Sequence, residues 1–125
     1  MQLRYLFGWL PCPIFFTKRF CGKYEAKSWG FFACVSNGPT DEGRIRHELK
    51  HCEDFYRYGL IGMFLLYTFS KKWRLFFELR GYSEELKHTT YMTRPLAAKL
   101  IADGYGLDVT AKEVDGMLAY YKTIT

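Results

Sequence analysis

The sequence lacks a long hydrophobic run. Its most apolar segment, residues 59–69, is about half as long as a helix that crosses a bilayer. Residues 1–16 contain an internal Pro11-Cys12-Pro13 and no small-residue cleavage site, which argues against a signal peptide. We therefore expect no transmembrane segment. Residues 59–69 are expected to form core beneath neighbouring helices, with contact to a membrane surface as the alternative.

The sequence has no Cys-x-x-Cys pair. The four cysteines are widely spaced, at Cys12, Cys21, Cys34 and Cys52. We expect reduced, mostly buried thiols of a cytoplasmic protein. A Cys12–Cys21 bridge is the alternative for an exported chain.

Strong charge of one sign is also missing, and so are internal repeats. The net charge is +5, and basic residues are densest at Lys71, Lys72 and Arg74. We interpret them as a solvated basic face, with nucleic-acid binding as the weaker alternative. Because 49% of the 125 residues are hydrophobic and 19% aromatic, the chain has enough apolar side chains to form one folded domain, residues 1–125.

The most informative pattern present is His47-Glu48-Leu49-Lys50-His51. Two histidines four residues apart on a helix face the same way and can hold one Zn²⁺. The glutamate between them is placed to take a proton from water that the metal activates. The alternative is a surface helix that carries two histidines without a metal.

The residues around this pattern predict a helix from about Asp41 to Tyr58. Thr40 or Asp41 can cap it after the turn at residues 37–39. At 100° per residue, one apolar stripe is formed by Ile45, Leu49, Cys52 and Tyr56. His47, Glu48 and His51 then lie on a flank beside the core, which suits a metal site.

A third ligand is expected from a second helix. Glu78 follows His51 by 27 residues, inside a helical segment at 71–82, between Phe77 and Leu79. An acidic residue among such neighbours favours metal coordination over a solvated surface position. Rival ligands are further along the chain, at Glu84, Glu85, His88 and Asp103.

With Glu78 added, the pattern resembles the gluzincin branch of the zincin metallopeptidases, in its minimal bacterial and phage-encoded forms. The resemblance covers residues 29–82. In many such proteins the third ligand opens a motif Glu-x-x-Ala-Asp or Glu-x-x-Ala-Tyr, and the corresponding run in this chain is Glu78-Leu79-Arg80-Gly81-Tyr82. Gly81 suggests a close approach of the two helices. Tyr82 takes the place of an aspartate that often supports a ligand histidine, and it is a candidate catalytic residue that hydrogen-bonds an imidazole or a transition-state oxygen.

The resemblance implies how a substrate binds. Residues 28–36 are aromatic and β-branched, and predict a strand. In zincins an edge strand above the metal receives a peptide or protein substrate as an added antiparallel strand. A buried strand without a ligand role is the alternative.

We expect an α+β fold with a small N-terminal antiparallel sheet, the metal-binding helix, the second ligand helix and C-terminal helices. Pro95 is expected to begin a short helix at 96–102, which Gly104 and Gly106 end. Thr110 and Glu113 form a capping box for a last helix. The apolar side of that helix is Val114, Met117, Leu118 and Tyr121.

The resulting hypothesis is a zinc-dependent peptidase. His47, His51 and Glu78 hold Zn²⁺, Glu48 is the general base, and Tyr82 or His88 supplies a second donor to the oxyanion. Two alternatives remain: a catalytically inactive zinc-binding interaction module, and a DNA-associated protease that uses the basic residues at 71–74. The sequence predicts neither the substrate nor the oligomeric state.

Overall fold

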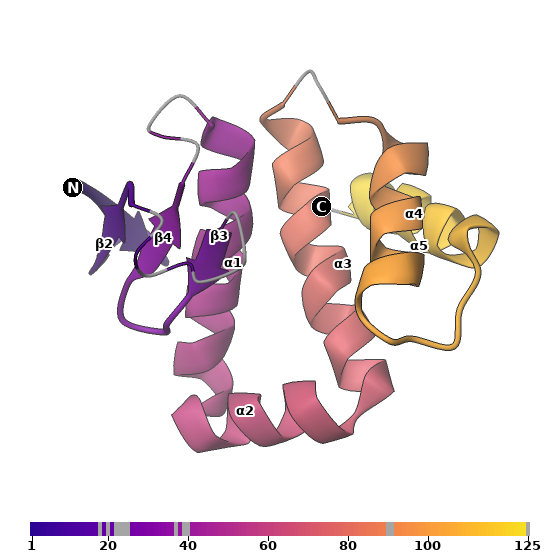
Figure 1. Ribbon diagram of the computed structural model, residues 1–125, viewed down its shortest axis with the longest axis horizontal. Helices are drawn as coiled ribbons and strands as arrows, with labels where there is room; N and C mark the ends of the chain where they lie inside the picture. Colours follow the sequence, from indigo (N-terminus) through magenta and orange to yellow (C-terminus); the bar gives the residue numbers. More distant parts are fainter. Residues whose placement is uncertain are drawn as a thin grey trace.

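The chain has an α+β fold, with a sheet at the N-terminus and helices in the rest (Figure 1). The computed structural model describes residues 1–17, 19, 21, 26–36, 38, 41–89 and 92–124, the last four as backbone only. The strands are β1 (Gln2–Leu6), β2 (Leu10–Phe15), β3 (Ala26–Ser28) and β4 (Ala33–Val35). The helices are α1 (Glu42–Tyr58), α2 (Leu60–Phe69), α3 (Lys71–Lys87), α4 (Arg94–Gly104) and α5 (Ala111–Ile124).

The sheet is mixed, so the prediction of a purely antiparallel sheet is wrong. Its strand order is β1-β2-β4-β3, and β2 pairs with β4 in parallel while the two other pairs are antiparallel. Of the strand expected over residues 28–36, only Ser28, the last residue of β3, and Ala33–Val35, which form β4, are in strands. Gly30, between them, has a φ of 92°, a left-handed backbone that interrupts an extended strand. Strand β3 is the last strand in the sheet order and lies at an edge.

Helix α1 forms as the sequence predicts. The Asp41 side chain accepts a hydrogen bond from the Arg44 backbone N–H, which caps the first turn. Ile45, Leu49 and Cys52 are buried in a cluster with residues from β1, β2 and β4. Tyr56, the fourth residue of the predicted stripe, is exposed, so the apolar stripe ends one turn early.

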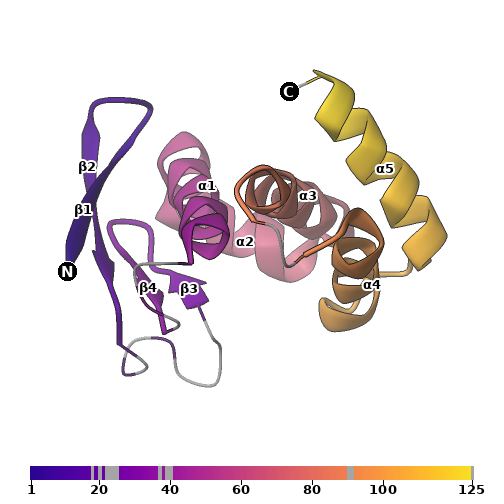
Figure 2. The same cartoon turned by 90° about the horizontal axis from the view of Figure 1, so that it is seen from above.

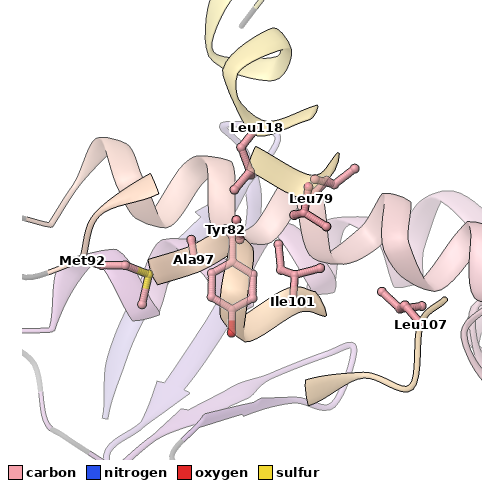
Figure 3. Close-up of a cluster of buried hydrophobic side chains, with 9 residues drawn as sticks. Leu79, Tyr82, Met92, Ala97, Ile101, Leu107 and Leu118 are labelled. Carbon is pink, nitrogen blue, oxygen red and sulfur yellow. The ribbon is translucent and has the colours of Figure 1, made fainter. Parts of the chain in front are cut away.

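Helix α3 continues five residues beyond the predicted end and packs against the C-terminal helices (Figures 1 and 2). Figure 3 shows the second core, in which Leu79 and Tyr82 of α3 meet Ile101 and Leu118. The predicted capping box is present, because Thr110 and Glu113 exchange hydrogen bonds. The predicted apolar side of α5 is confirmed for Val114 and Leu118, which are buried, whereas the Tyr121 side chain lies outside the described residues.

Helix α2 connects α1 to α3 and lies across their ends (Figure 1). Residues 59–69 were expected to lie in the core, but Met63 is the only buried residue of α2. Gly59, with a φ of 76°, and Ser70, which caps α3, separate α2 from its neighbours. The prediction that residues 59–69 lie buried is therefore wrong.

The cysteines differ from expectation. Cys21 and Cys34 form a disulfide, whereas Cys12 and Cys52 are free and buried. The prediction of four reduced thiols is wrong for the first pair, and so is the Cys12–Cys21 alternative. Disulfides persist mainly in oxidising compartments, so a cytoplasmic location stays a prediction that this pair does not favour. No helix among the described residues is both long and apolar enough to cross a membrane.

Candidate metal centre

Three predicted ligands meet between the two cores. His47 and His51 are one turn apart on α1, and Glu78 projects from the neighbouring helix α3. The Nε2 atoms of the histidines are 3.0 Å apart. Glu78 Oε2 is 3.5 Å from His47 Nε2, and Glu78 Oε1 is 3.2 Å from His51 Nε2.

The spacing of these atoms, 3.0–3.5 Å, is close to that around a zinc ion, with the two histidine nitrogens somewhat nearer to each other. Nitrogen and oxygen ligands of a tetrahedral zinc lie at about 2.0–2.2 Å from it, and so about 3.3–3.5 Å from one another. The donor set, two imidazoles and one carboxylate, is one that zinc prefers. Glu78 Oε2 is buried and has no hydrogen-bond partner among the described residues. A buried acceptor without a donor is costly, and a cation would satisfy it.

Gly81 permits the two helices to approach, as the sequence suggested. A Cβ atom at this position would lie 2.7 Å from His47 Nε2, which is closer than real Cβ contacts. The imidazole of His47 occupies the space that a side chain at position 81 would take. The glycine at position 81 therefore has a steric reason.

Glu85 fixes the ring of His47 from the side opposite to Glu78. His47 Nδ1 lies 2.7 Å from Glu85 Oε1, and Arg44 Nη2 is 3.6 Å from the other carboxylate oxygen. A carboxylate on Nδ1 leaves Nε2 as the atom that faces the ligand cluster. The sequence analysis named Glu85 as a rival ligand, whereas in the structure Glu85 contacts the Nδ1 side of His47, away from the ligand cluster.

The carboxylates around His47 favour a positive charge on it. Burial by itself would lower the pKa of His47, but the contacts with Glu78 and Glu85 and the nearby charge of Glu48 raise it to about 9. For Glu78, burial would raise the pKa, but interactions with His51 and His47 hold it well below its usual range. The site thus stabilises a cation among its carboxylates.

Buried carboxylates are concentrated at this centre. Glu48, Asp54, Glu78 and Glu85 are all buried. Arg44 lies beside Glu85, and Asp54 Oδ1 is 3.0 Å from Arg80 Nη1 and 4.0 Å from Arg57 Nη1. Among the described residues no guanidinium group forms an ion pair with Glu48 or Glu78, so a divalent cation would bring positive charge to these two.

Tyr67 is a site residue that the sequence analysis missed. Its hydroxyl donates a hydrogen bond of 2.9 Å to Glu78 Oε1. Tyr67 belongs to α2, so its proximity depends on how α2 crosses the ends of α1 and α3. The apolar pattern of residues 59–69 carries no signal for this contact.

Glu48 and the three ligand candidates line one open cavity of about 800 Å³. The edge strand β3 forms one wall, and α2 contributes Met63, Phe64, Tyr67 and Thr68. Such a volume holds several residues of a peptide.

Tyr82 lies behind His47 and does not line this cavity. Its ring packs edge to face on the His47 ring, with centroids 4.5 Å apart, and its hydroxyl is 3.1 Å from that of Tyr105. In this position the phenol supports the histidine. His88, the other predicted oxyanion donor, is exposed and lies 3.4 Å from Glu84.

The remaining candidates lie apart from the ligand cluster. Glu84 lies near Lys87 and His88, and Asp103 is exposed. In the basic segment, Arg74 donates three hydrogen bonds to backbone carbonyls and Lys71 pairs with Asp108. Arg74 is therefore engaged within the chain, whereas Lys71 takes part only in an exposed ion pair.

Comparisons with protein families, with curated proteins and with solved structures find no match to this chain. Any functional assignment therefore depends on the geometry of the cluster itself.

Proposed function

We propose that this protein is a zinc-dependent peptidase, in which His47, His51 and Glu78 hold the metal. The observation that carries the proposal is the convergence of these three ligands beside Glu48 in one open cavity. The buried carboxylates, and the buried Glu78 oxygen that accepts no hydrogen bond among the described residues, support a divalent cation there. The resemblance to minimal gluzincins agrees with the same residues.

Each side chain at the site has a separate role in the proposed hydrolysis. A zinc ion at this site supplies a Lewis acid that polarises a carbonyl and brings the pKa of water towards about 7. Glu48 accepts the proton of the attacking water and delivers it to the leaving amine. Glu85 and Tyr67 hold His47 and Glu78 in place.

The proposed substrate is an extended peptide. Strand β3 is the end strand of the sheet, and its three residues line the cavity. A peptide could add to this edge as a further strand. This arrangement would bring the scissile carbonyl past the histidines and Glu48.

The decisive variant is Glu48→Gln. It keeps the size of the side chain but removes the base, so cleavage of a peptide library should fall by about 10²- to 10⁴-fold. Zinc content, measured on the same sample, should stay unchanged because Glu48 is not a ligand. Full activity in this variant would remove Glu48 as the base. A wild-type protein that holds zinc and cleaves no peptide would favour the alternative, a zinc-binding interaction module.

A further inference from the structure

Helix α2 presents an apolar face to solvent. Leu60, Ile61, Phe64, Leu65 and Phe69 are exposed, and both Ile61 and Phe69 have 77% of their surface accessible. The spacing i, i+1, i+4, i+5, i+9 places these side chains on one side of a helix. Met63 is buried on the opposite side. Single exposed apolar residues are common on protein surfaces, but a continuous face of five marks a docking surface.

The apolar face continues beyond α2. Leu60 shares a small hollow with Phe31 and Tyr56, whose rings are 6.3 Å apart. At the other end of α2, Phe69 is followed by exposed Trp73 in the first turn of α3. Aromatic side chains of this kind are enriched where a protein meets the interface of a bilayer.

The charges that flank this face have one sign. Between residues 55 and 77 the four charged side chains are all basic, at Arg57, Lys71, Lys72 and Arg74. The Arg74 guanidinium donates hydrogen bonds to backbone carbonyls. The side chains of Arg57, Lys71 and Lys72 are exposed. Asp108 lies 2.8 Å from Lys71, but because this ion pair is exposed to solvent, the attraction between the two side chains is weak. The complementary partner is anionic, whereas a second copy of the chain would bring like charges together.

We propose that α2 docks in the plane of an anionic lipid surface. The exposed apolar side chains enter the headgroup region, and Lys71 and Lys72 contact lipid phosphates. At ten residues, α2 is about 15 Å long, so it lies on the bilayer and does not cross it. Phe64 lies on the docking face and also lines the cavity, so docking would bring the cavity mouth close to the lipid surface. This inference does not depend on the proposed peptidase activity.

The test is flotation of the full chain with two kinds of vesicle, phosphatidylcholine alone and phosphatidylcholine with phosphatidylglycerol. We expect binding to the anionic vesicles that weakens with salt. Ile61→Ser/Phe69→Ser should lower partitioning at least about tenfold. The matched control, Leu96→Ser/Leu100→Ser, changes two exposed leucines of α4 and should leave partitioning unchanged.

Charge variants test the electrostatic part. Lys71→Gln/Lys72→Gln should lower partitioning about 30-fold, at about fivefold for each charge. Lys99→Gln/Lys112→Gln, two exposed lysines of α4 and α5, is the control and should have a smaller effect. Asp108→Asn removes the opposing charge and should raise partitioning about fivefold.

Three results would overturn the proposal. Equal binding to neutral vesicles would show that charge has no part in it. If Ile61→Ser/Phe69→Ser still bound anionic vesicles as the wild type does, membrane binding would not depend on α2. The third result combines two observations: the wild type does not bind vesicles, and in lipid-free sedimentation it forms a dimer that Ile61→Ser/Phe69→Ser dissociates. This result would assign the face to a second copy of the chain.

Discussion

His47 is held at both nitrogens of its ring. Glu85 binds Nδ1, and Nε2 faces His51 and Glu78. The ring is packed edge to face against Tyr82 and lies over Gly81. The side chain therefore has one orientation, and a metal that binds there meets a nitrogen already in position.

Glu85 supports the orientation of His47. Glu85→Gln keeps the size of the side chain but weakens the hydrogen bond to His47 Nδ1. Zinc affinity should fall by about 10- to 100-fold, because carboxylates behind ligand histidines orient them and raise their basicity. Competition with a chromogenic chelator measures this affinity. Glu84→Gln, a neighbour that contacts Lys87 and His88 instead, is the control, and equal affinities in the two variants would contradict a supporting role.

At the scale of the element, the centre depends on how closely α1 and α3 approach. A Cβ on Gly81 would overlap the His47 ring. Gly81→Ala should therefore lower zinc affinity and destabilise the fold by about 1–3 kcal/mol, even though alanine is the better helix former. Thermal unfolding with and without zinc measures both effects.

Gly116→Ala is the matched control for this substitution. Gly116 is exposed in α5, and a Cβ there would meet no atom within 4 Å. This variant should gain up to about 1 kcal/mol from helix propensity. If Gly81→Ala were equally stabilising, the close approach of α1 and α3 would not constrain the site.

Local patterns predicted the elements that carry their own signals. Asp41 caps α1, Thr110 and Glu113 cap α5, and the four-residue spacing puts His47 and His51 on one face. Each of these features depends on residues within one turn of helix. Glu78 could be selected as a ligand because its neighbours are apolar.

The errors arise where tertiary contacts decide. Apolar residues alone do not tell whether a partner covers them, so α2 was assigned to the core although most of it is exposed. The contacts of Tyr67 and Glu85 join residues 11 and 38 positions apart, and no local pattern reports them. Likewise, the turn at Gly30 divides a segment that reads as one strand.

At the scale of the whole molecule, α1 and α3 lie between the sheet and helices α4 and α5 (Figure 2), and the candidate metal centre lies between α1 and α3. The carboxylates near it make the metal-free protein sensitive to pH. Because contacts with Glu78 and Glu85 raise the pKa of His47 from 6.5 to about 9, protonation of His47 stabilises the metal-free fold. This contribution is complete below pH 6.5 and is lost as pH rises through 9.

Thermal unfolding of the chelated protein should follow this pattern. Stability should fall by about 3 kcal/mol between pH 6.5 and 9. The zinc-loaded protein should lose less, because the metal takes the place of the proton on His47. A His47→Gln variant is the control, and a chelated wild type whose stability matches this variant at every pH would contradict the shift.

The central claim is that His47, His51 and Glu78 hold one zinc ion. The most direct test is the zinc content of the purified protein after dialysis, compared with that of Glu78→Ala. We predict one zinc per chain in the wild type and a sharp loss in the variant. A wild type without zinc, or a variant that retains all of it, would contradict the account.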